Sequence, residues 1–217
     1  MIKTVIHQPD FLPWLGFFDK ISFADQFIVL DDVQFSRRGW THRDKIDIGG
    51  KIRWLTVPVK KANYDQAINK IEISYENDWI DYHFNILQES YKNEKNYKSF
   101  VKELFEIYEK KFSLLIDFNF ELLKLIISKM KIKTKILFSS DFNISSKNSD
   151  KIIDLLEITK SNNYITGKPS LNYLDLDKFF KKKIQIEIYN FDFKKYENKK
   201  INLDLSVIDY LMKYDSE

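Results

Sequence analysis

The stretch T-V-I-H-Q-P-D-F-L-P-W-L-G-F-F-D-K-I, residues 4–21, decides the expected fold. Its apolar beginning predicts a short buried strand over 2–7, which ends at a histidine. A loop with two prolines and a tryptophan follows, and apolar residues then recur at helical spacing over 16–24. The next apolar run, 26–30, predicts a second buried strand. Strand, short helix, strand is the pattern of a parallel sheet with helical crossovers.

The rest of the chain continues this pattern around a helical segment. Gly49-Gly50 between two strand-like runs predicts a β-hairpin, and the spacing of apolar residues is helical from about 79 to 130. Further strands are expected at 70–74, 133–138, 163–166 and 184–189, and helices at 150–160, 176–182 and 205–212, the last capped by Ser206. We therefore predict one α/β domain over 1–217, with a mostly parallel, Rossmann-like sheet flanked by helices, a β-hairpin and a helical insertion at about 79–130.

Composition excludes several classes of protein. The chain has no cysteine, which rules out disulfides, thiolate catalysis and cysteine-ligated metals. A net charge of +3 is too small to argue for nucleic-acid binding, and lysine-rich segments such as 92–95 and 181–183 fit a solvated surface. Neither a signal peptide nor an apolar run long enough to cross a bilayer is visible. We expect a soluble, cytoplasmic protein without membrane insertion.

Polar residues follow four of the expected strands. Ligands of an open parallel sheet bind beyond the carboxyl ends of its strands, so these residues are candidates for one pocket. They are His7 and Gln8, then Asp31, Asp32 and Gln34, then Ser139 and Ser140, and finally Gly167 and Lys168. The loop after the second strand adds Arg37, Arg38, His42 and Arg43. We expect the imidazole, the carboxylates and the guanidinium groups to share a single cavity.

His7, Asp31 and Asp32 each have a structural alternative. His7 is either a buried histidine bonded to backbone or a site residue, and its place between a strand and a proline-containing loop favours the site. The two aspartates either cap a helix or pair with Arg37 or Arg38, or they act in the pocket. Adjacent strand residues point to opposite faces, so at most one of the two is expected to face the pocket.

The arginines and tryptophans also have two interpretations. Charge clusters are usually solvated surface, yet every arginine of this lysine-rich chain lies between 37 and 53. The planar fork of arginine suits bidentate contact with phosphate or carboxylate, which favours an anion site. Trp14 and Trp40 are expected either in the core or a lid, or stacked on a ligand.

Several common motifs are missing. The chain has no G-x-x-x-x-G-K-[ST] phosphate loop, no G-x-G-x-x-G and no G-x-S-x-G nucleophile elbow. His7, His42, Asp31 and Asp32 are of ligand types that bind metals, but no pair has the spacing of ligands on one helix. We expect no metal site.

The sequence resembles the WbqC-like family. The specific part is H-Q-P-D-F-L-P-W-L-G-F-F-D-K-I, followed by A-D-Q-F-I-V-L-D-D-V-Q-F and R-G-W-T-H-R-D-K-I. Weaker matches are W-L-T-V-P-V at 54–59, S-S at 139–140, Y-I-T-G-K-P-S-L-N-Y-L at 164–174 and S-V-I-D at 206–209. The chain departs from the family pattern at His42-Arg43, where the pattern has Asn-Arg.

The resemblance implies a role in bacterial surface-glycan biosynthesis. Members are encoded in O-antigen (lipopolysaccharide) and other surface-glycan gene clusters, and some have been proposed as glycine transferases acting on amino sugars. This implies an aminoacyltransferase or ligase that forms an amide on a nucleotide-linked amino sugar. His7 or one of the aspartates would take the proton of the amine, the arginines would hold the diphosphate, and Trp14 or Trp40 would stack on a ring. The alternatives are a nucleotide-sugar-binding protein without catalysis and a scaffold in a glycan-assembly complex.

A second resemblance concerns the acyl donor. The opening strand, loop and helix look like those of nucleotidyltransferase-type adenylate-forming ligases, which use ATP with Mg. Those enzymes carry H-x-G-H where this chain has Trp14-Leu15-Gly16-Phe17. The donor is therefore either an adenylate made in place, a charged tRNA such as glycyl-tRNA, or a carrier thioester.

Overall fold

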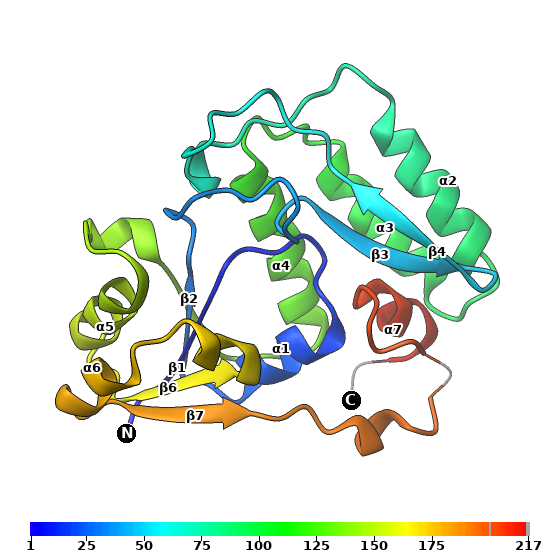
Figure 1. The fold of residues 1–217 in the computed structure, drawn as a ribbon. Helices are drawn as coiled ribbons and strands as arrows, with labels where there is room; N and C mark the ends of the chain where they lie inside the picture. Colours follow the sequence, from blue (N-terminus) through cyan, green and yellow to red (C-terminus); the bar gives the residue numbers. More distant parts are fainter. Residues whose placement is uncertain (200, 216–217) are drawn as a thin grey trace. The chain divides into compact units, whose positions relative to one another are not determined.

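The chain divides into two compact units (Figure 1). The computed structural model describes residues 1–199 and 201–215. Unit 1 comprises Met1–Gln8, Gly16–Asp32 and Lys133–Tyr196, and unit 2 comprises Pro9–Leu15, Val33–Ile132 and the residues from Glu197 on. The predicted mixed α/β fold is confirmed, and the expectation of one domain over 1–217 stays a prediction.

Unit 1 is built on a five-stranded sheet in which every neighbouring pair is parallel. The strand order is β5-β2-β1-β6-β7. The strands are β1 (Lys3–His7), β2 (Gln26–Val29), β5 (Lys135–Phe138), β6 (Asn163–Gly167) and β7 (Gln185–Tyr189). These strands lie where the sequence predicts them, and they confirm the mostly parallel sheet.

Alternation along the strands decides which helix covers which face of this sheet. Even-numbered residues such as Ile6 and Ile28 share a buried cluster with apolar residues of α5 (Asn148–Ile158) and α6 (Leu176–Lys181). Phe27 points the other way and meets Phe17 of α1 (Leu15–Ser22), with ring centroids 5.7 Å apart. Because successive strand residues face opposite sides, His7 belongs to the α1 face.

Unit 2 contains the predicted hairpin and the predicted helical insertion. The hairpin consists of β3 (Arg43–Ile48) and β4 (Lys51–Thr56). Its turn residues Gly49 and Gly50 have φ of 55° and 86°, a conformation that suits glycine and matches the twist of the strands. The helices are α2 (Trp79–Tyr91), α3 (Tyr97–Tyr108), α4 (Leu115–Lys129) and α7 (Ile208–Lys213). Within the part of the chain that the structure describes, no helix is long and apolar enough to cross a membrane.

Two local predictions are wrong. The segment 70–74 is not a regular strand: it follows a 3-10 turn, Ile68–Lys70, and makes only isolated bridges. Ser206 is not the cap residue of the last helix, which begins at Ile208. The Ser206 hydroxyl instead donates to the Leu12 carbonyl (2.7 Å) and accepts from the Ile208 amide (3.3 Å).

The proline-containing loop after β1 is held by a buried side chain of α4. The Asn119 amide nitrogen donates to the carbonyl oxygens of Pro9 (2.8 Å) and Thr41 (2.7 Å). The Phe11 amide also donates to the Trp40 carbonyl (2.9 Å). Asn119 is 2% exposed, so both carbonyls depend on it for hydrogen bonding away from water. One asparagine therefore fixes two motif segments that are distant in the sequence.

We predict that Asn119→Ala lowers the free energy of unfolding by about 2 kcal/mol, because it leaves two buried carbonyls without a donor. Asn85→Ala is the matched control, since Asn85 is an exposed residue of helix α2. Both variants replace asparagine by alanine within a helix, so helix propensity changes by the same amount in each. Urea denaturation followed by circular dichroism measures the difference. Equal unfolding midpoints for the two variants would contradict a stabilising role of the two Asn119 hydrogen bonds.

Candidate functional site

The carboxyl edge of the unit 1 sheet has a topological switch point between β1 and β6. In chain order within the unit the strands read 3-2-1-4-5, so connections leave the sheet in opposite directions on either side of β1 and β6. The ladder between these two strands ends at Val5 and Ile165, whereas β1 pairs with β2 as far as His7 and β6 with β7 as far as Gly167. Ligands of open α/β sheets bind at such a point.

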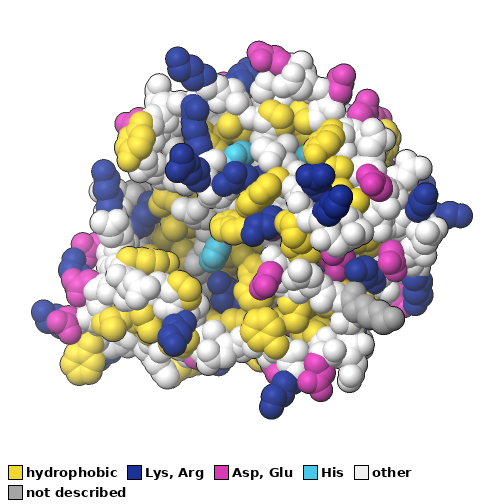
Figure 2. Space-filling model, turned by 45° about the vertical axis from the view of Figure 1, so that its right-hand side comes forward, with side chains coloured by type: hydrophobic (Ala, Val, Ile, Leu, Met, Phe, Trp, Pro, Cys, Tyr) yellow, Lys and Arg dark blue, Asp and Glu magenta, His cyan; other side chains and the backbone are white. Residues whose placement is uncertain are grey.

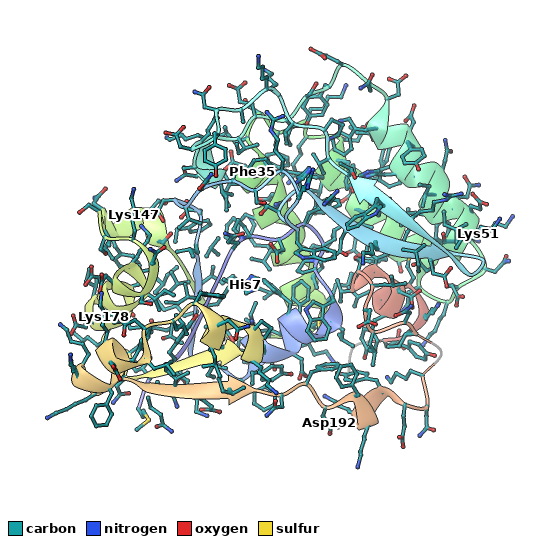
Figure 3. The ribbon with its side chains drawn as sticks, in the orientation of Figure 1. His7, Phe35, Lys51, Lys147, Lys178 and Asp192 are labelled. Atoms are coloured by element: carbon teal, nitrogen blue, oxygen red, sulfur yellow. The ribbon has the colours of Figure 1, made fainter. Side chains whose placement is uncertain are left out.

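His7 lies at the end of β1, at this switch point of the sheet (Figure 3). Its ring stands edge-on to Phe17, with centroids 5.1 Å apart. Nδ1 lies 3.1 Å from the Gln8 carbonyl oxygen. A carbonyl only accepts, so we assign the proton to Nδ1, which leaves Nε2 with the lone pair. Desolvation, with a smaller contribution from Lys20, lowers the pKa of His7 from 6.5 to about 3. The imidazole is therefore neutral at pH 7.

The two aspartates after β2 both bond to the serines after β5. The Asp31 carboxylate accepts from the Ser139 hydroxyl (3.0 Å), the Ser140 amide (3.1 Å) and the Ser140 hydroxyl (2.7 Å). The Ser139 hydroxyl also lies 2.5 Å from Asp32. The expectation that adjacent aspartates point apart is thus wrong, because β2 ends at Val29 and the strand alternation ends with it.

Lys151 is a residue of this cluster that the sequence analysis missed. Its ammonium lies 2.7 Å from Asp32 and 3.2 Å from the Ile144 carbonyl. The Lys151 side chain is 7% exposed and that of Asp32 20%. A lysine among the apolar residues Ile152, Ile153, Leu155 and Leu156 of a helix was a usable signal, because buried lysines need a partner.

The end of β6 carries a small group of hydroxyls next to the predicted Gly167 and Lys168. The Thr166 and Tyr173 hydroxyls donate to the Ser170 hydroxyl at 2.7 and 3.0 Å. Gly167 has room for a methyl group, since a Cβ there meets only Pro169, at 3.6 Å. Packing inside the chain therefore does not require glycine at this position. Lys168 is exposed, as an anion-binding lysine has to be.

The predicted arginines lie in unit 2, on the loop before the hairpin and at its first residue. Arg37 donates to the Ala62 carbonyl (3.1 Å), and Arg43 donates to the Arg38 carbonyl (2.8 Å). Within residues 1–199 and 201–215, none of Arg37, Arg38 and Arg43 forms an ion pair, and the Nε of Arg43 is buried without a hydrogen-bond partner. Asp31 and Asp32 belong to unit 1, so their pairing with Arg37 or Arg38 stays a prediction.

Trp40 lies beside a second tryptophan, Trp54, which the sequence analysis did not select. The ring centroids are 5.5 Å apart. Arg43 and Lys45 lie over these rings: the Arg43 guanidinium carbon is 4.4 Å from the centroid of Trp54, and the Lys45 ammonium is 5.1 and 5.2 Å from those of Trp40 and Trp54. Trp14 is half-buried and bridges to Ser206.

The other predicted residues of unit 2 have structural contacts. Gln34 donates to the Tyr64 carbonyl (2.7 Å). His42 is buried, packs edge-on to Phe35 and has its pKa lowered to about 4 by desolvation and by Arg43. Next to it, desolvation raises the pKa of Asp44 to about 7, with a further contribution from the charge of Asp10.

The structure therefore assembles the predicted residues in two sets. Unit 1 holds those of the sheet edge, namely His7, Gln8, Asp31, Asp32, Ser139, Ser140, Gly167 and Lys168. Unit 2 holds those of the loops and the hairpin, namely Trp14, Gln34, Arg37, Arg38, Trp40, His42 and Arg43. That all of them share one cavity stays a prediction.

Comparison with known proteins identifies the family. The model of the WbqC-like protein family matches residues 8–217. The chain belongs to the WbqC-like family. This WbqC-like chain is also 29% identical over 194 residues to the uncharacterized protein Rv1507c of Mycobacterium tuberculosis, an alignment that covers 88% of the chain and 84% of that protein. No solved structure matches it.

The similarity to adenylate-forming ligases ends at the two histidine positions. Phe17, at the second of these positions, is 3% exposed and packs against His7, Phe18 and Phe27. A residue in that place supports the core and offers nothing to a phosphate. In this WbqC-like protein the α1 residue at the second position therefore has a packing role.

We predict that Lys151→Met lowers the free energy of unfolding by about 2 kcal/mol, somewhat below the loss at a fully buried ion pair because Asp32 keeps contact with water. Lys178→Met is the control. It removes an exposed, solvent-screened pair with Asp150 (2.7 Å) and should leave the free energy of unfolding nearly unchanged. Chemical denaturation measures both, and adding Asp32→Asn to Lys151→Met has to recover part of the loss.

We predict that the protein loses stability as the pH falls from 6.5 toward 4. Burial lowers the pKa of all three histidines, His7 to about 3 and His42 and His83 to about 4, so the unfolded chain binds more protons in this window. The raised pKa of Asp44 acts in the opposite sense between 3.8 and about 7. Asp44→Asn should therefore steepen the rise of unfolding free energy with pH, measured by urea denaturation at intervals from pH 4.5 to 7. An unchanged or shallower slope would contradict the burial of Asp44.

Proposed function

We propose that this WbqC-like protein transfers a glycyl or related acyl group to the amino group of a nucleotide-linked amino sugar, in the biosynthesis of a bacterial surface glycan. The observation that carries the proposal is the neutral His7 at the switch point of the sheet, with the hydroxyls of Thr166, Ser170 and Tyr173 at the neighbouring strand end. A glycan is rich in hydroxyl groups, and an amide-forming step needs a proton acceptor.

The tautomer of His7 suits the proton transfer. The Gln8 carbonyl holds the proton on Nδ1, and Nε2 is then the basic nitrogen. An amine that attacks an acyl carbon becomes much more acidic as the new bond forms, so a weakly basic imidazole accepts its proton at that stage. A bound phosphate near His7 would raise its pKa from this low value.

The arginine loop supports recognition of the diphosphate. Arg37 and Arg38 are exposed, and their guanidinium groups are not committed to ion pairs within the described chain. Arginine binds two phosphate oxygens at once, and it remains charged at every physiological pH. This favours a nucleotide-linked sugar over a free one.

We propose that the acyl donor arrives already activated, as a glycyl ester such as glycyl-tRNA or as a carrier thioester. Phe17 and Trp14 occupy the two positions whose histidines would stabilise the phosphate in an ATP-dependent activation. The sugar nitrogen forms a bond to the glycyl carbon, and the amine proton passes to Nε2 of His7. The ester C–O or thioester C–S bond breaks, and the imidazolium returns the proton to the departing hydroxyl or thiol. ATP with Mg is the competing donor system.

A second candidate is binding of the nucleotide-sugar without turnover. The hydrogen bonds around Asp31 and Asp32 favour it, because both carboxylates already serve the cluster with Ser139, Ser140 and Lys151.

Mass spectrometry tests the proposal. UDP-linked and dTDP-linked amino sugars are incubated with the protein and either glycyl-tRNA or glycine with ATP and Mg. We expect the sugar nucleotide to gain the mass of one glycine residue with glycyl-tRNA. Product only with ATP, accompanied by AMP, would replace the activated-donor proposal by a ligase, and binding without any mass gain would favour the second candidate.

We predict that His7→Asn reduces turnover at least about 100-fold, as expected for loss of a general base. Asparagine keeps a donor for the Gln8 carbonyl and removes the basic nitrogen, so thermal stability and nucleotide-sugar binding should persist. Asn85→Ala serves again as the inert control. Turnover by His7→Asn within about tenfold of the parent would remove His7 from the chemistry.

A further inference from the structure

One face of the hairpin carries Trp54 with two cations, and Trp40 of the preceding loop lies beside it. We call Trp40, Trp54, Arg43 and Lys45 the hairpin platform. Trp40 is 44% and Trp54 39% exposed, although tryptophan is a large apolar side chain. Large apolar surface rimmed by polar groups marks a binding surface more often than a solvated one.

The register of the hairpin builds this platform. Lys45 of β3 lies directly opposite Trp54 of β4, and Arg43 is two residues before Lys45, on the same face. The opposite face carries Asp44, Ile46 and Leu55, which are buried. The two faces of the hairpin therefore differ: buried residues lie on one face, and Trp54 lies with Arg43 and Lys45 on the other.

The contacts within the platform keep its rings in place. Arg43 stacks over Trp54 at 4.4 Å, and its guanidinium is tied to the Arg38 carbonyl at 2.8 Å. The Lys45 ammonium is within 5.2 Å of both ring centroids. Such cation–π contacts hold flexible side chains near one geometry without neutralising them. A ligand thus meets ordered rings and undiminished positive charge.

The charge around the platform is positive. Arg37 and Arg38 are exposed nearby in the sequence. Of the acidic residues of the hairpin, Asp44 is buried on the other face, and Asp47 lies two residues beyond Lys45 on the platform face, where it accepts from the Gly50 amide at 2.7 Å. Figure 2 shows Lys and Arg side chains standing among hydrophobic ones on the face turned to the viewer.

We propose that the hairpin platform binds a nucleoside diphosphate, with the base stacked on Trp40 and the phosphates held by Arg43, Lys45 and Arg38. The proposal rests on the proposed function and names the part of the substrate that unit 2 recognises. A planar ring with attached negative charge is the ligand that uses both properties of the platform. The platform is one hairpin wide, which suits a mononucleotide better than a long polyanion.

Calorimetric titration with UDP, dTDP and GDP tests the proposal, with inorganic pyrophosphate and a short single-stranded RNA as comparison ligands. Trp40→Ala should weaken nucleoside diphosphate binding roughly ten- to hundredfold, as loss of one stacked base does. It should leave the much weaker binding of pyrophosphate unchanged. Lys45→Met should weaken both and reduce the dependence of affinity on salt.

Tyr64→Ala is the matched control, because Tyr64 is an exposed aromatic residue of unit 2 outside the platform, with 90% of its surface in solvent. It should bind every ligand as the parent does. Unchanged UDP affinity of Trp40→Ala, equal affinities for UDP and pyrophosphate, or binding of RNA alone would each overturn the proposal. Glycyl transfer is measured separately, so failure of the transferase leaves a stacking loss at Trp40 visible.

Discussion

The carboxylate of Asp31 is the constraint on which the carboxyl edge of the sheet depends. It is 3% exposed and accepts hydrogen bonds from Ser139 and Ser140, which follow β5. Between β2 and β5 the chain leaves unit 1 for the whole of Val33–Ile132. The entropy lost on closing a loop grows only with the logarithm of its length, so a few hydrogen bonds and a short ladder suffice to bring such distant ends together.

The contact between the ends of β2 and β5 also explains which side chains meet at the carboxyl edge of the sheet. Once β5 is fixed beside β2, Asp32 reaches Lys151 of α5, and the ends of β2 and β5 carry a hydrogen-bonded network of two carboxylates, two serines and one ammonium. His7 then stands between this network and the end of β6. The exposed arginines Arg37 and Arg38 of unit 2 carry no such pairing with carboxylates within the described chain.

The sequence predicts the features that depend on neighbouring residues. Local periodicity and turn chemistry predict where the strands lie along the chain, the Gly49-Gly50 hairpin and the helical stretch. The partners of Asp31, Asp32, Asn119 and Trp54 do not, because each contact joins residues that only the folded chain brings together. The alternation rule failed at Asp31 and Asp32 for a related reason. It holds inside a strand, and β2 ends two residues earlier.

The low basicity of His7 bears on the stage of the proposed reaction at which its imidazole would accept a proton. Its pKa of about 3 reflects mainly desolvation and secondly the charge of Lys20, while the Gln8 carbonyl acts in the opposite direction. A negative charge brought to the end of β1 opposes the effect of Lys20 and stabilises the protonated ring. Each unit by which the pKa rises adds about 1.4 kcal/mol to the affinity of the ring for a proton. In the proposed transfer, an anionic substrate would thereby improve the base that acts on it, and the imidazole would stay neutral until that substrate is bound.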